Sequence, residues 1–107
     1  MTITSTQTES QVRNIAVGRY LTDGTAAAFN LTVGFTARYV RIVNVTSRDQ
    51  YEWFEGMDAA SSLKTVAAGT RTITTTLGIT VSGNTVTVGL DLDVNVTAEQ
   101  LSWIAIG

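Results

Sequence analysis

Residues 71–88 read RTITTTLGITVSGNTVTV, a run that suits a β-sheet far better than a helix. Ile, Val and Thr carry two heavy atoms on Cβ, and their stiff χ1 angle favours a pleated strand. Ser82, Gly83 and Asn84 break the run with residue types that supply the positive φ angles of a tight hairpin. The stretch therefore predicts two antiparallel strands, at residues 79–81 and 85–90, joined by a short turn.

Similar runs extend outward from this hairpin in both directions. They are rich in Val, Ile, Thr and aromatic residues and are separated by glycines, a pattern typical of β-sandwiches and barrels. The predicted strands cover residues 14–22, 27–33, 37–45, 50–55, 63–67, 70–76, 79–81, 85–90 and 101–106. One helical turn, which Thr97 would cap, is expected at residues 96–100. We therefore expect an all-β, antiparallel domain over residues 12–107.

Residues 1–11 differ from the rest of the chain, because they alternate Thr and Ser with other polar residues. Beyond the initial Met, Ile3 is their only aliphatic side chain, so burial offsets little of the entropy lost on ordering. This segment is predicted to be an extended N-terminal arm that becomes an added strand against a partner. Ile3, Thr4 and Thr6 are its candidate contact residues.

The composition limits the classes of partner. Charged residues make up 15% of the 107 residues, against about 25% in an average soluble domain. A surface with so few charges is easily desolvated, which suits a protein that packs against neighbouring molecules. The alternative interpretation is a monomer whose polar surface is supplied by Thr. The net charge is −2 and the seven basic residues are scattered, so no nucleic-acid binding is expected. No leader peptide and no apolar run of about 20 residues is present, so no membrane association is expected and synthesis is assigned to the cytoplasm.

Residue types that perform catalysis are scarce. The chain has no His and no Cys, which removes the commonest general base, the thiol nucleophile and the usual zinc ligands. Glu52 and Glu55 flank Trp53, but residues three apart on a strand point to opposite faces and do not form a glycosidase pair. We expect instead that Trp53 packs inward and that both glutamates are solvated or lie in an interface.

A second acidic pair, Asp91 and Asp93, shares one face of an extended segment. Two carboxylates supply too few oxygens for Ca²⁺, which takes six to eight. We expect these aspartates to be solvated at a sheet edge, while Leu90, Leu92 and Val94 face the core. No catalytic, cofactor-binding or metal-binding residue is therefore assigned, and the chain is predicted not to be an enzyme.

An aromatic cluster at residues 51–57 is the strongest remaining feature. Aromatic side chains and Met are enriched at the centres of protein interfaces. Strand alternation places Trp53 in the core, and it leaves Phe54 and Met57, with Glu55 between them, as candidate contact residues.

Several short motifs in the last two thirds of the chain resemble a known group of proteins. The motifs are Gly-Phe-Thr-Ala-Arg-Tyr-Val-Arg-Ile-Val-Asn at residues 34–44, Tyr-Glu-Trp at 51–53, Glu-Gly-Met at 55–57, Lys-Thr at 64–65, Ala-Gly-Thr-Arg-Thr at 68–72 and Leu-Ser-Trp-Ile-Ala-Ile-Gly at 101–107. Over residues 34–107 the chain resembles the small virion proteins of tailed bacteriophages.

The resemblance implies a jelly-roll-like β-sandwich that acts as a capsid cement or decoration protein. Such a protein sits on the virion capsid surface, binds the major capsid protein and forms a homotrimer. The alternative function is a tail-fibre or carbohydrate-binding β-sandwich module for receptor recognition, in which exposed Tyr and Trp residues stack on sugars.

Overall fold

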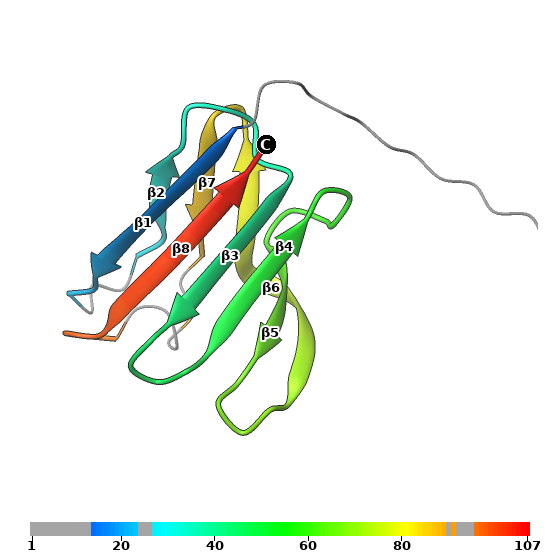
Figure 1. Cartoon of the computed structure of the whole chain (residues 1–107). Coiled ribbons are helices and arrows are strands. Elements are labelled where there is room, and N and C mark those ends of the chain that lie inside the picture. The colour runs from blue at the N-terminus through cyan, green and yellow to red at the C-terminus, as the bar shows by residue number, and fades with distance from the viewer. Residues whose placement is uncertain (1–13, 24–26, 90, 92–95) are drawn as a thin grey trace, which may run out of the picture.

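The computed structural model describes residues 14–23, 27–89, 91 and 96–107, which contain eight β-strands and no helix. The strands are β1 (Ile15–Leu21), β2 (Phe29–Thr32), β3 (Tyr39–Asn44), β4 (Gln50–Phe54), β5 (Ser61–Thr65), β6 (Arg71–Ser82), β7 (Thr85–Val88) and β8 (Gln100–Ile106). They form one antiparallel sheet in the order β1-β8-β3-β4-β5-β6-β7-β2 (Figure 1). The predicted all-β antiparallel fold is confirmed.

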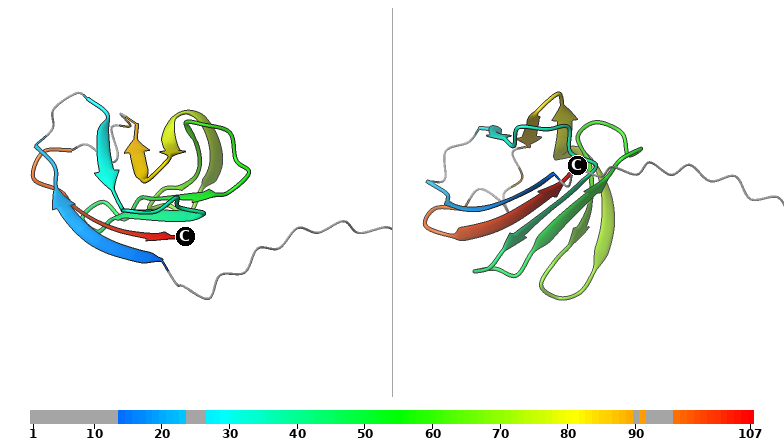
Figure 2. Two further views of the ribbon diagram at one scale, coloured as in Figure 1. Left: turned by 90° about the horizontal axis from the view of Figure 1, so that it is seen from above. Right: turned by 45° about the horizontal axis from the view of Figure 1, so that its top comes forward.

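The sheet curls until its two halves face each other across the core (Figure 2). We call β1, β8, β3, β4 and β5 the front layer, and the C-terminal half of β6 with β7 and β2 the rear layer. Both layers belong to one continuous hydrogen-bonded sheet, because β6 pairs with β5 in front and with β7 behind. A jelly-roll sandwich of two separate sheets is not confirmed.

β6 passes from one layer to the other at a corner near Gly78. Ser62 pairs with Thr74 but the adjacent Ser61 pairs with Ile79, so the register jumps, and Leu77 takes a positive φ of 62°. A Cβ on Gly78 would lie 2.6 Å from the carbonyl oxygen of Ala60, an approach that only glycine permits. The corner therefore joins the predicted strands 70–76 and 79–81 into one long strand.

The predicted helical turn at residues 96–100 is wrong. Ala98 has a φ of 64°, outside the helical region, and Gln100 already begins β8. The amide of Ala98 donates to the carbonyl of Thr22, and the amide of Thr22 donates to the carbonyl of Glu99. Pairing with the end of β1 thus replaces the internal hydrogen bonds that a helix would need.

The core lies between the two layers and follows strand alternation. Every second residue of β3, β4 and β7 is buried, and Trp53 is among these residues, as alternation predicted. On β8 Leu101 and Ala105 are buried, and Trp103 between them is half-buried. The buried apolar side chains are Ala37, Val40, Ile42, Tyr51, Trp53, Ile79, Val86, Val88, Leu101 and Ala105.

At the open side of the curl the two terminal strands, β1 and β2, are in contact through two aromatic rings. Tyr20 and Phe29 pack edge to face, with 4.7 Å between their ring centroids.

Candidate interaction surface

The outer side of the front layer faces the viewer in Figure 1. The strand register places a row of apolar side chains there, across β1, β8, β3 and β4. In the sheet register Ile15 on β1 lies opposite Ile106, Ile106 lies opposite Tyr39, and Tyr39 lies opposite Phe54. The rings of Tyr39 and Phe54 are 5.1 Å apart between centroids. Ile15 is 56% exposed and Phe54 49% exposed, so this row presents apolar surface to the surroundings.

A second row lies beside the first and combines apolar and charged groups. Val17 is opposite Ile104, which is opposite Arg41, which is opposite Glu52. Val17 is 70% exposed, and Leu21 at the end of the same strand is 68% exposed. We call the two rows together with Leu21 the outer front face.

Neighbouring side chains restrain the charges on this face. The Tyr39 hydroxyl donates to Glu52 Oε2 at 2.8 Å, and Arg41 Nη2 donates to Gln50 Oε1 at 2.8 Å. Partial burial, followed by the interaction with Glu52, raises the pKa of Tyr39. The polar groups of the outer front face therefore have hydrogen-bond partners in the isolated chain.

The outer side of the rear layer has the opposite character. Its first cross-strand row is Thr80, Thr87 and Asn30, and its second is Ser82, Thr85 and Thr32. All six side chains carry a hydroxyl or an amide, and Thr87 Oγ1 donates to Asn30 Oδ1 at 2.8 Å. The two outer faces of one molecule thus differ: the two rows of the outer front face are largely apolar and lie beside a more polar row with Arg19, Ser102 and Gln50, whereas both rear rows are polar throughout.

The residues predicted as contacts lie in different environments. Phe54 belongs to the outer front face. Glu55 is exposed next to it and lies 3.6 Å from Arg38 Nε. Met57 is partly buried against the core, and its sulfur accepts the amide hydrogen of Phe54. Ile3, Thr4 and Thr6, with the rest of the predicted arm at residues 1–11, lie outside the described residues.

The contribution of β1 to this face was not predicted. On this strand Ile15, Val17 and Leu21 point outward together with Arg19, while the inner side holds the small Ala16 and Gly18 and the larger Tyr20. The signal in the sequence is this alternation of large apolar with small residues. It was missed because the usual rule assigns the large apolar residues to the core.

Asp91 does not lie at a solvated edge as predicted. Its side chain is 14% exposed and forms an ion pair with Lys64 Nζ at 3.1 Å, which brings the end of the β7 segment against β5. Burial of both groups requires this pairing. Asp93, Leu90, Leu92 and Val94 lie outside the described residues, and the part of the chain that is described holds no cluster of metal-binding side chains.

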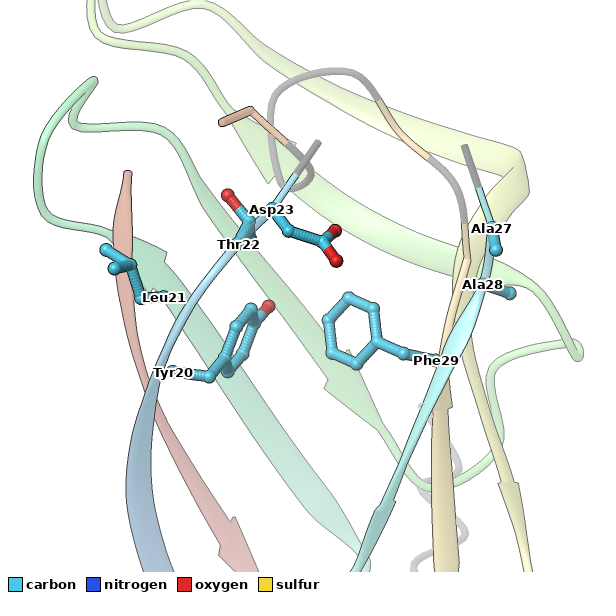
Figure 3. Close-up of a pocket in the computed structure, with 7 residues that line it drawn as sticks. All are labelled: Tyr20, Leu21, Thr22, Asp23, Ala27, Ala28 and Phe29. Carbon is cyan, nitrogen blue, oxygen red and sulfur yellow. The ribbon is translucent and has the colours of Figure 1, made fainter. Parts of the chain in front are cut away.

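A pocket of about 350 Å³ opens between the ends of β1 and β2 (Figure 3). Tyr20 and Phe29 form its aromatic wall, and the remaining lining residues are Leu21, Thr22, Asp23, Ala27 and Ala28. The Tyr20 hydroxyl is buried without a hydrogen-bond partner among the described residues, and burial raises the pKa of Tyr20. The pocket combines an apolar wall with a carboxylate.

Comparison of the chain with protein-family models, with curated proteins and with solved structures gives no match. Among the described residues, no helix of sufficient length and apolar character to cross a membrane is present.

Proposed function

We propose that this protein is a structural component of the virion of a tailed bacteriophage, a capsid cement or decoration protein that binds the assembled shell through its outer front face. The observation that carries the proposal is the contrast between the apolar outer front face and the polar rear face. An exposed apolar patch that crosses several strands of a soluble domain marks an interaction site. In the bound state the rear face, with its hydroxyl and amide groups, would stay in contact with water.

The composition supports the same role. Each charge that is buried in an interface without a partner is costly to desolvate, and this chain has 15% charged residues. On the outer front face Glu52 and Arg41 already have hydrogen-bond partners, so docking of an apolar surface leaves few groups unsatisfied. The partner is the major capsid protein, and the N-terminal segment, including Ile3, Thr4 and Thr6, would extend the contact to a neighbouring subunit.

The mechanism of such a protein is mass action rather than chemistry. A ligand that binds only the assembled shell stabilises each site by about 2.7 kcal/mol when its concentration is 100 times Kd. The protein would be made in the bacterial cytoplasm and reside on the capsid surface. Neither a cofactor nor a metal ion enters this mechanism.

The direct test is to add the purified chain to shells that were assembled without it. Saturable co-sedimentation and a higher shell melting temperature are the expected results. If the chain failed to bind shells from the particle that contains it, the cement function would be abandoned.

The pocket between β1 and β2 favours a second candidate function, recognition of a carbohydrate receptor. Pockets for small ligands have volumes of roughly 300–1,000 Å³ and apolar walls with a few polar groups, which fits the setting of Tyr20, Phe29 and Asp23. Trp53 is buried, so it would not stack on a sugar. Titration with a broad glycan panel, followed by tyrosine and tryptophan fluorescence, tests this function, and unchanged spectra throughout would argue against it.

A further inference from the structure

β1 has one unpaired edge. It is a terminal strand of the sheet and, among the described residues, pairs with β8 alone. Gly107 N donates to Asn14 O and Thr22 N donates to Glu99 O, so the even-numbered residues along β1 face β8. Because hydrogen-bonded and non-hydrogen-bonded pairs alternate in antiparallel sheets, the amide and carbonyl groups of Ile15, Val17, Arg19 and Leu21 point to the open side.

This edge lacks the usual protection against pairing. Natural edge strands are kept single by charges, proline, bulges or short length. β1 has seven residues in regular register with β8, it contains no proline, and Arg19 is its only charge. The other terminal strand, β2, is four residues long and presents polar Asn30 and Thr32 outward. The two edges are therefore not equivalent, and β1 is the one suited to add a strand.

We propose that β1 pairs antiparallel with β1 of a second copy of this chain, with Gly18 on the two-fold axis. In this register Ile15 lies opposite Leu21 of the second copy, and Val17 lies opposite Arg19. The four residues with open amide and carbonyl groups then form the hydrogen-bonded pairs, and Gly18 forms the non-hydrogen-bonded pair at the axis. Every open backbone group of the strand gains a partner from one symmetric contact.

The side chains of β1 favour a second copy of this chain as the partner at the open edge. The strand is apolar at both ends, so the two-fold places Ile15 against Leu21 twice and sets no like charges directly opposite each other. At the axis Gly18 adds no side chain on the inner side, where Trp103 already lies close enough that a Cβ would be 2.7 Å from its ring. A self-complementary patch is what an isologous dimer requires.

The dimer would place both outer front faces on the same side of one continuous sheet, which doubles the apolar surface available to a shell. This two-fold pairing differs from the homotrimer that the resemblance implies. Its existence does not depend on the proposed function, because it is measured on the isolated chain. A strand of seven residues alone buries less than a standard interface, so the dimer should be reversible and dependent on concentration.

Sedimentation equilibrium of the purified chain over a wide concentration range tests the pairing. The expected mass rises from 11.4 kDa to twice that value, without larger species. Val17→Pro removes an open amide while leaving the β1–β8 hydrogen bonds intact, and it should abolish the dimer; Val17→Ala, which keeps the amide, should retain it. A trimer, a monomer at every concentration, or a dimer that persists in a folded Val17→Pro variant would overturn the proposal.

Two substitutions of opposite charge at Val17 test the register even if the proline variant does not fold. Val17→Glu would place a carboxylate opposite Arg19 of the second copy, whereas Val17→Lys would place a cation there. Both changes remove the same apolar side chain, so pairing in this register predicts a dimer Kd at least about fivefold lower for Val17→Glu, with the difference shrinking in 1 M salt. Equal Kd values for the two variants at low salt would overturn the register.

Discussion

Asn44 organises the turn between β3 and β4 from a fully buried position. Its Oδ1 accepts the amide hydrogens of Thr46 and Ser47, each at 3.0 Å, and its Nδ2 donates to Glu99 Oε2 at 2.7 Å. One side chain thus joins the β3–β4 turn to the segment that enters β8. These three hydrogen bonds satisfy the buried amide and hold the backbone of the turn in place.

Asn44→Ala is expected to lower the free energy of unfolding by about 1–3 kcal/mol, because it leaves buried hydrogen-bonding groups without partners. Urea denaturation followed by tryptophan fluorescence measures the change. Asn30→Ala, at an exposed asparagine on β2, is the control and should change stability by no more than about 0.5 kcal/mol. Equal effects of the two substitutions would show that the turn does not depend on the Asn44 contacts.

Tyr20 predicts how stability depends on alkaline pH. Burial raises its pKa above the ordinary value of 10.0, so above about pH 10 the unfolded chain loses this proton while the folded chain keeps it. The stabilising effect is complete below pH 10 and is lost as the pH rises further. Urea denaturation at about pH 7 and about pH 11 should therefore show a smaller loss for Tyr20→Phe than for the wild type.

Tyr20→Phe also checks the absence of a partner for the buried hydroxyl. At neutral pH the variant should be within about 1 kcal/mol of the wild type or more stable, because no hydrogen bond is lost among the described residues. Tyr39, whose pKa is also raised, remains in both proteins and accounts for a common part of the pH dependence. An unchanged slope with pH in the variant would contradict the assignment to Tyr20.

Among the strands, β6 has the most demanding geometry. At its corner the backbones of Ala60, Leu77 and Gly89 come together around Gly78, whose amide donates to Ala60 O and whose carbonyl accepts from Gly89 N. The neighbours that a Cβ on Gly78 would meet are backbone atoms, which do not rotate away as a side chain can.

Gly78→Ala is expected to destabilise the protein by about 1–3 kcal/mol or more through this backbone clash. Thr76→Ala, at an exposed position two residues earlier on the same strand, should change stability by no more than about 0.5 kcal/mol. Thermal unfolding monitored by circular dichroism compares the two variants. If both melted at the same temperature, the tight corner at Gly78 would be incorrect.

The sequence predicted the position of most strands but not how they connect. Dense β-branched residues marked the β6–β7 hairpin, and its turn lies at Gly83 and Asn84 as expected. Leu77 and Gly78 instead looked like a break between two strands, because a local pattern does not distinguish a turn from a bend within one strand. The ion pair of Lys64 with Asp91 was equally hidden, since it joins residues 27 positions apart.

At the scale of the whole molecule, curvature determines which residues are available to a partner. A single sheet that folds over itself has two outer faces and two terminal strands. Here the outer front face and the terminal strand β1 are largely apolar, whereas the rear face and the outward residues of β2 are polar. Strand alternation predicted the buried position of Trp53 on β4. It did not identify the outer front face, because the small inward residues of β1 reversed the usual assignment and because neighbouring strands are distant in sequence.

The central claim, that the outer front face binds a shell, is tested most directly by a matched pair of single substitutions. Ile104→Lys places a cation on the outer front face, and Thr87→Lys places the same side chain on the outer rear face. Wild type and both folded variants are titrated against shells assembled without the protein, and co-sedimentation is measured. We predict that the wild type and Thr87→Lys bind alike, whereas Ile104→Lys loses at least about tenfold in affinity, a change of about 1.4 kcal/mol. Equal binding of the two variants, or stronger loss for Thr87→Lys, would contradict the account.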